Sequence, residues 1–188
     1  MHKVRRLTGL VLHILLACAL ISPALAGDSI ELELLSDISR PGTVALMTAA
    51  VAMPLFDDDG QNDALRTADA MACAALLSIG AKRGIHSPRP DGTDNNSFPS
   101  SHATVAFAAA TMAADRKPGQ APYWYGAAAL IAYSRVRLKR HRTRDVIAGA
   151  LLGFGVAKFE QAMPRGLLLS PFIDPETECT GVEVTWEF

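Results

Sequence analysis

Three short groups of residues contain the side chains that could do chemistry: three cations, two histidines, one carboxylate and two neighbouring serines. In chain order they are Lys82, Arg89, Ser100, Ser101, His102, Arg135, His141 and Asp145. Cationic and hydroxyl donors can hold a tetrahedral oxyanion, and an imidazole can attack its central atom. The sequence therefore indicates chemistry on a phosphate-like group.

His141 and Asp145 lie four positions apart near the start of a predicted helix, so their side chains share one face. A carboxylate that accepts from one ring nitrogen fixes the tautomer and leaves the other nitrogen as a nucleophile. We therefore expect His141 to attack the substrate and Asp145 to orient the ring. Taken alone, the pair is more typical of an ordinary helix surface, and Ser134 and Arg135 upstream of it favour the functional interpretation.

Ser100, Ser101 and His102 stand where a second helix begins. A helix N-terminus presents free backbone N–H groups and the positive end of the helix dipole, which together bind phosphate. We expect a hydroxyl donor from Ser100, a backbone donor from Ser101 and a proton for a departing oxygen from His102. The alternative is that Ser100 only caps the helix, because capping and anion binding compete for the same groups.

Lys82, Arg89 and Arg135 are the expected phosphate-binding cations. Cationic donors around a transferring phosphoryl group give its main electrostatic stabilisation. Each of them could instead be a solvated surface cation. Pro88 and Pro90 favour the first interpretation, since they stiffen the backbone on both sides of Arg89.

These groups resemble the signature of the type 2 phosphatidic acid phosphatase family, which is related to bacterial class A acid phosphatases and vanadium haloperoxidases. The family pattern reads K-x6-R-P, P-S-G-H and S-R-x5-H-x3-D. The sequence matches the first and third blocks at every fixed position, from Lys82 to Pro90 and from Ser134 to Asp145. In the second block Ser101 replaces glycine, which matters only if the backbone there needs an angle that serine avoids.

The resemblance implies a phosphatase that needs no metal or other cofactor. In it His141 attacks phosphorus, and His102 protonates the leaving group and then acts as the base that activates water. It favours lipid phosphates such as phosphatidic acid or polyprenyl diphosphates as substrates. The alternatives are a broad-specificity periplasmic acid phosphatase for soluble phosphomonoesters, a vanadium haloperoxidase, and a binding protein that holds phosphate without turnover. The sequence does not name the phosphate ester or the oligomeric state.

Composition favours an all-α fold. The 188 residues are 49% hydrophobic but only 6% aromatic, and alanine is abundant. A net charge of −1 gives no reason to expect nucleic acid as a partner. We predict a compact helical bundle with the active site at one end and a short extended tail. The predicted helices cover 29–35, 43–56, 63–83, 100–114, 123–136 and 143–161, and the alternating segment 182–188 predicts a strand without an obvious partner.

The N-terminus has the pattern of a signal peptide. A basic start, an apolar run and the small-x-small site at 24–26 predict cleavage after Ala26 and export, most simply to a periplasm. The predicted organisation is a signal peptide at 1–26, the helical phosphatase-like domain at 27–165 and the tail at 166–188. An uncleaved anchor, or a lipidated N-terminus at Cys18, is the alternative. No later segment is expected to span a membrane.

Three further features lead to expectations: a pair of cysteines, a basic segment and a pair of glycines. Cys73 and Cys179 could form a disulfide in an oxidising compartment, or Cys73 could simply be a small buried residue. The basic segment 135–144 could contact a lipid headgroup or a membrane surface. Gly149 and Gly153, four positions apart, indicate close helix packing.

Overall fold

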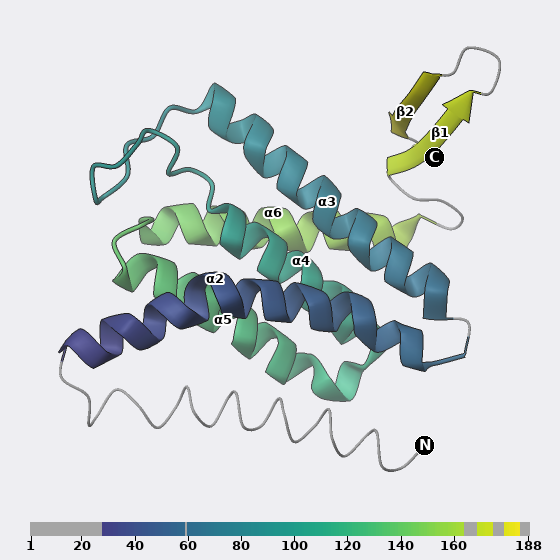
Figure 1. Ribbon diagram of the computed structural model, residues 1–188, viewed down its shortest axis with the longest axis horizontal. Coiled ribbons are helices and arrows are strands. Elements are labelled where there is room, and N and C mark those ends of the chain that lie inside the picture. Colours follow the sequence, from purple (N-terminus) through teal and green to yellow (C-terminus); the bar gives the residue numbers. More distant parts are fainter. Residues whose placement is uncertain (1–27, 59, 164–168, 175–178, 185–188) are drawn as a thin grey trace.

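The computed structural model describes residues 28–58, 60–163, 169–174 and 179–184, with side chains described over 31–58 and 60–163. The predicted signal peptide and the Cys18 alternative lie outside these residues. The described part is all-α, as predicted, and it adds a small hairpin that was not predicted (Figure 1). Its elements are α2 (Asp28–Ala52), η1 (Met53–Phe56), α3 (Gly60–Gly84), α4 (Ser101–Arg116), η2 (Pro118–Gln120), α5 (Ala121–Arg137), α6 (Thr143–Ala162), β1 (Leu169–Asp174) and β2 (Cys179–Val184).

The last four helices confirm the predicted ranges, but the predicted break at Pro41 is wrong. α2 runs without interruption through this proline. Pro41 is exposed, so the carbonyl that loses its intrahelical bond can face water. A buried stripe continues on both sides of it, at Leu35, Ser39, Leu46 and Ala50, and this continuous packing holds the helix together.

α4 is the central helix, and α2, α3, α5 and α6 all pack against it. Its alanines form much of the core, which explains the composition. They include Ala106, Ala108, Ala109, Ala110 and Ala113. The predicted close packing at Gly149 and Gly153 is confirmed, because an added Cβ at Gly153 would lie 2.0 Å from the Thr104 carbonyl oxygen of α4.

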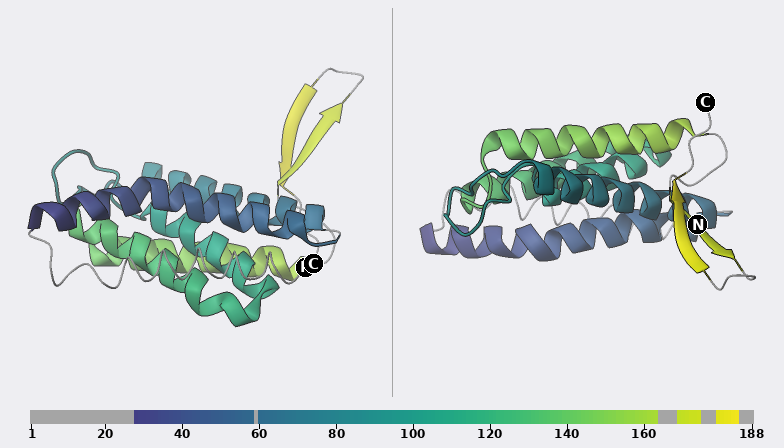
Figure 2. Two further views of the ribbon diagram at one scale, coloured as in Figure 1. Left: turned by 60° about the horizontal axis from the view of Figure 1, so that its bottom comes forward. Right: turned by 90° about the horizontal axis from the view of Figure 1, so that it is seen from above.

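The C-terminal strand has a partner that the sequence did not reveal. β2 pairs with β1 in antiparallel register, with Leu169 opposite Val184, and the hairpin lies at the other end of the bundle from the loop 85–100 (Figures 1 and 2). Cys73 on α3 forms no disulfide with a residue whose side chain the structure describes. The side chain of Cys179 is outside the described residues, so the disulfide stays a prediction.

One of the described helices, α3, is long and apolar enough to cross a membrane, although a core helix of a soluble protein passes the same test. Our sequence analysis had singled out no such segment after the leader. Both α3 and α6 also expose large apolar side chains. These are Leu65, Leu76, Leu77 and Ile79 on α3, and Ile147, Leu151, Phe154 and Phe159 on α6.

Candidate active site

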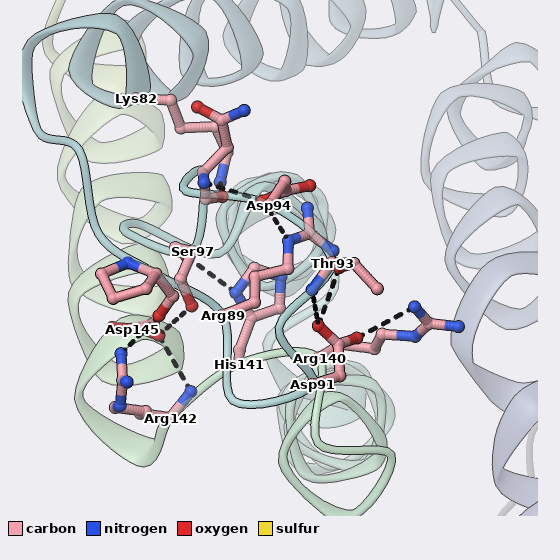
Figure 3. Close-up of polar contacts among 12 residues, drawn as sticks. Lys82, Arg89, Asp91, Thr93, Asp94, Ser97, Arg140, His141, Arg142 and Asp145 are labelled. Carbon is pink, nitrogen blue, oxygen red and sulfur yellow. Dashed lines mark hydrogen bonds and ion pairs between the residues drawn. The ribbon is translucent and has the colours of Figure 1, made fainter.

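All eight predicted site residues lie on elements that meet at the end of the bundle that carries the loop 85–100 (Figure 1). Figure 3 shows four of them, Lys82, Arg89, His141 and Asp145. This loop connects α3 to α4, and the short connection 138–142 joins α5 to α6 beside it. Lys82 lies in the last turn of α3 and Arg89 in the loop. Ser100 immediately precedes α4, which begins with Ser101 and His102. Arg135 lies in the last turn of α5, His141 in the following connection and Asp145 in the first turn of α6.

His141 is held with one ring nitrogen occupied. The ring is buried, and its Nδ1 lies 2.7 Å from the carbonyl oxygen of Ser97. A carbonyl can only accept, so Nδ1 carries the proton and Nε2 keeps its lone pair. Burial, and then the charge of Arg135, lower the pKa of His141 to about 4. The ring is therefore neutral near pH 7 and can act as a nucleophile through Nε2.

Asp145 does not bind His141 directly, which corrects the expected contact. Its Oδ2 accepts from the Ser97 hydroxyl at 2.6 Å and from the Arg142 backbone N–H at 2.9 Å (Figure 3). Ser97 thus joins the two residues, because its carbonyl accepts a hydrogen bond from His141 Nδ1–H and its hydroxyl donates to Asp145. The sequence analysis missed Ser97, since it lies in a loop and belongs to none of the three motif groups.

The predicted cations lie close enough to repel one another. Burial, and then the charge of Arg89, lower the pKa of Lys82 to about 8. Burial and the same Arg89 charge lower the pKa of Arg135 to about 10. Positive charges that lie close together and away from water lower one another's pKa values, and a bound anion would offset this effect. The cluster formed by Lys82, Arg89 and Arg135 therefore suits an anionic ligand.

Hydrogen bonds to the loop 85–100 fix the positions of Lys82 and Arg89. The Lys82 ammonium donates to the carbonyls of Asn96 and Pro99, at 2.7 and 2.6 Å. Arg89 Nε donates to the Asp94 carboxylate at 2.8 Å. These contacts fasten both cations to the loop 85–100, so the loop sets their positions.

Arg135 reaches across to α2, where its Nη1 donates to the Ser39 hydroxyl at 2.5 Å. It is 7% exposed. Ser39 and Arg40 were missed by the sequence analysis, which placed a helix break at this point. His102 is half-buried beside them, and burial, followed by the charges of Arg135 and Arg40, lowers its pKa to about 4.

At the start of α4, the Ser100 hydroxyl is not used to cap the helix. Ser100 makes no side-chain cap, and its buried hydroxyl has no hydrogen-bond partner among the described residues. Capping therefore does not compete with anion binding here. The Ser101 hydroxyl lies 2.7 Å from that of buried Ser78 on α3. Ser101 is outside the left-handed backbone region, so the change from glycine is sterically tolerated.

Much of the basic segment 135–144 is engaged within the protein. Arg137 pairs with Glu31 of α2, Arg140 pairs with Asp91 at 3.0 Å, and Arg142 donates to the Pro88 carbonyl. Through these contacts the segment anchors α2 and the loop 85–100. Among residues with described side chains, no group of three or more His, Cys, Asp or Glu is arranged to hold a metal ion.

Comparisons with known proteins agree with this architecture. The family model of the PAP2 superfamily matches residues 63–166. A lipid A 1-phosphatase of Porphyromonas gingivalis is 39% identical over 74 residues, which are 37% of this chain and 17% of that protein. The match thus spans less than a fifth of that curated relative.

Two solved structures share the fold. One is LpxE of Aquifex aeolicus, with a TM-score of 0.64 and 20% identity over 73% of this chain and 89% of that one. The other is a transmembrane PAP2 type phosphatidylglycerolphosphate phosphatase of Bacillus subtilis. It has a TM-score of 0.55 and 21% identity over 85% of this chain and 97% of that one.

Proposed function

Because the chain belongs to the PAP2 superfamily, we propose that it is a metal-independent phosphatase acting on phosphomonoesters or diphosphates. The observation that carries the proposal is the buried ring of His141, whose Nδ1 lies against the Ser97 carbonyl, close enough to Lys82, Arg89 and Arg135 that their charges add to the effect of burial in lowering its pKa. The cations suit the oxygens of a phosphoryl group, and the free Nε2 suits attack on its phosphorus.

In the first step His141 Nε2 attacks phosphorus, the bond to the leaving oxygen breaks, and His102 donates a proton to that oxygen. Lys82, Arg89 and Arg135 hold the equatorial oxygens. Ser100 supplies its hydroxyl and Ser101 its backbone N–H, as two further donors.

In the second step water attacks the phosphorus of phospho-His141, and His102 accepts the proton that water loses. The P–N bond breaks, phosphate leaves, and the starting state of His141 returns. Asp145 contributes through Ser97, whose carbonyl receives the Nδ1–H as the ring becomes positively charged.

His102 can donate a proton only if its pKa rises when substrate binds. Burial and the neighbouring cations hold that pKa at about 4. A bound phosphate dianion would neutralise those cations and favour the protonated ring. The ligand would thus switch His102 into its acid form.

For the substrate we propose a lipid phosphate, at an exported site that faces a membrane surface. The relatives whose names specify a substrate act on lipid A and on phosphatidylglycerolphosphate. The exposed apolar side chains of α3 and α6 would suit contact with lipid, and the predicted leader would direct export.

The decisive experiment is to trap the phosphohistidine with a labelled substrate and a rapid quench in base, where phosphohistidine survives. Wild type and the control His86→Ala, which changes an exposed loop histidine, should both retain label. His141→Ala should retain none and should lose activity. Equal label on His141→Ala would overturn the mechanism, and hydrolysis of a nucleotide monophosphate tenfold better than short-chain phosphatidic acid would overturn the lipid assignment.

A further inference from the structure

Arg40 of α2 is a cation that none of the motif groups includes. It is exposed, and it makes no hydrogen bond or ion pair with another residue that the structure describes. Its neighbour Ser39 is buried and receives a hydrogen bond from Arg135 at 2.5 Å. α2 therefore reaches the cation cluster at this turn, and Arg40 lies next to it on the solvent side.

The charge of Arg40 acts on two site residues. It is among the charges that lower the pKa of His102 and of Arg135. On His102 its effect is larger than that of Arg89 or Lys82, which are cations of the proposed phosphate site. Arg40 thus belongs to the part of the site where His102 lies.

We propose that Arg40 binds a second phosphoryl group of the substrate, the one that departs with the leaving group when a diphosphate ester is hydrolysed. This inference rests on the proposed function. In that reaction the bond between the terminal phosphorus and the bridging oxygen breaks, and the proton of His102 passes to this oxygen. The departing phosphate therefore lies on the His102 side of the broken bond, within reach of the Arg40 charge.

The two phosphates would be divided between two sets of cations. Lys82, Arg89 and Arg135 would hold the terminal phosphoryl group that transfers to His141. Arg40 would hold the inner phosphate, for which a guanidinium offers two parallel donors. A monoester of the same alcohol has no charge at this position, so the enzyme should prefer the diphosphate ester.

The test uses the full chain and a matched pair of substrates, an isoprenoid diphosphate and the monophosphate of the same isoprenoid. Arg40→Gln should lower kcat/KM about tenfold for the diphosphate and less than twofold for the monophosphate. Arg40→Lys should restore part of the loss. The control Arg83→Gln removes another exposed arginine, at the end of α3, and should change neither value by more than twofold.

A binding measurement keeps the inference separate from the proposed function. Calorimetry should show that Arg40→Gln weakens methylene diphosphonate about tenfold and inorganic phosphate less than twofold. Equal weakening of both anions, or of neither, would overturn the inference while the phosphatase assignment stands. A wild type that binds neither anion and hydrolyses neither ester would overturn the proposed function itself.

Discussion

Replacing Gly153 by alanine should destabilise the protein strongly, because α4 and α6 approach each other most closely here. An added Cβ would lie 2.0 Å from the Thr104 carbonyl oxygen and 3.0 Å from the Ala108 nitrogen. Both atoms belong to the α4 backbone, so no side chain can rotate away. To restore an ordinary contact of roughly 3.4 Å from the 2.0 Å that the added Cβ would have, the two helices would have to separate by about 1.4 Å.

Such overpacking costs typically about 1–3 kcal/mol, and sometimes more when backbone must move. The helix propensity of alanine over glycine returns about 1 kcal/mol. Because the α4 backbone itself must move, we take an overpacking cost of about 4 kcal/mol. The net loss is then about 3 kcal/mol, which corresponds to roughly 10 °C in Tm for a chain of this size. Circular dichroism melts and urea titrations of purified protein would measure it.

Gly155→Ala is the matched control on the same helix. Its added Cβ would meet nothing within 4 Å, so only propensity acts, and stability should rise by about 0.5–1 kcal/mol. Gly149→Ala would place a Cβ 2.5 Å from the Ser100 carbonyl and should reduce activity as well as stability. A Gly153→Ala protein that melts at or above the wild-type temperature would refute the reasoning.

Four further predictions concern the site. Ser97→Ala should lower kcat about tenfold, because it removes the link to the carboxylate of α6, whereas Ser87→Ala on the same loop removes a hydroxyl without a described partner and should leave kcat unchanged. Activity should fall above about pH 8 as Lys82 loses its charge, and Lys82→Arg should move that limb to higher pH. The pKa values of His102 and His141 are lowered to about 4 in the folded protein, so below about pH 6.5 the unfolded chain binds more protons than the folded one. Tm should therefore fall as the pH drops below about 6.5, and His141→Gln should make the fall between about pH 6.5 and 5 shallower. Activity should survive a chelator, because the proposed steps use no metal; loss that a divalent ion restores would contradict them.

The helices were predictable wherever the sequence marks their ends. Gly84 closes α3, and a glycine and proline follow α4, so local punctuation and the observed ends agree. Pro41 shows the limit of this rule. Its effect depends on whether the freed carbonyl can reach water and whether packing continues past it, and both are properties of the tertiary structure.

In the site, too, sequence spacing predicted which residues lie near each other but did not predict their hydrogen-bond partners. Spacing within a helix or a turn placed His141 and Asp145 near each other, but it did not reveal that Ser97 lies between them. Ser97 precedes Asp145 by 48 positions, and Ser39 precedes Arg135 by 96. A single sequence holds no signal for partners so far apart, unless both belong to a known motif.

In the proposed reaction the same cations help His141 and hinder His102. Without a ligand, burial and the cations keep both histidines neutral, which suits His141 as the nucleophile but leaves His102 without a proton to give. When a phosphate dianion binds, it offsets the charges that act on His102, and the pKa of that ring rises. His141 is held differently, because its Nδ1 proton already forms a hydrogen bond to the Ser97 carbonyl. In the proposed reaction its Nε2 attacks phosphorus. The same ligand can therefore charge one histidine as an acid while the other attacks as a base, although their pKa values without a ligand are nearly equal.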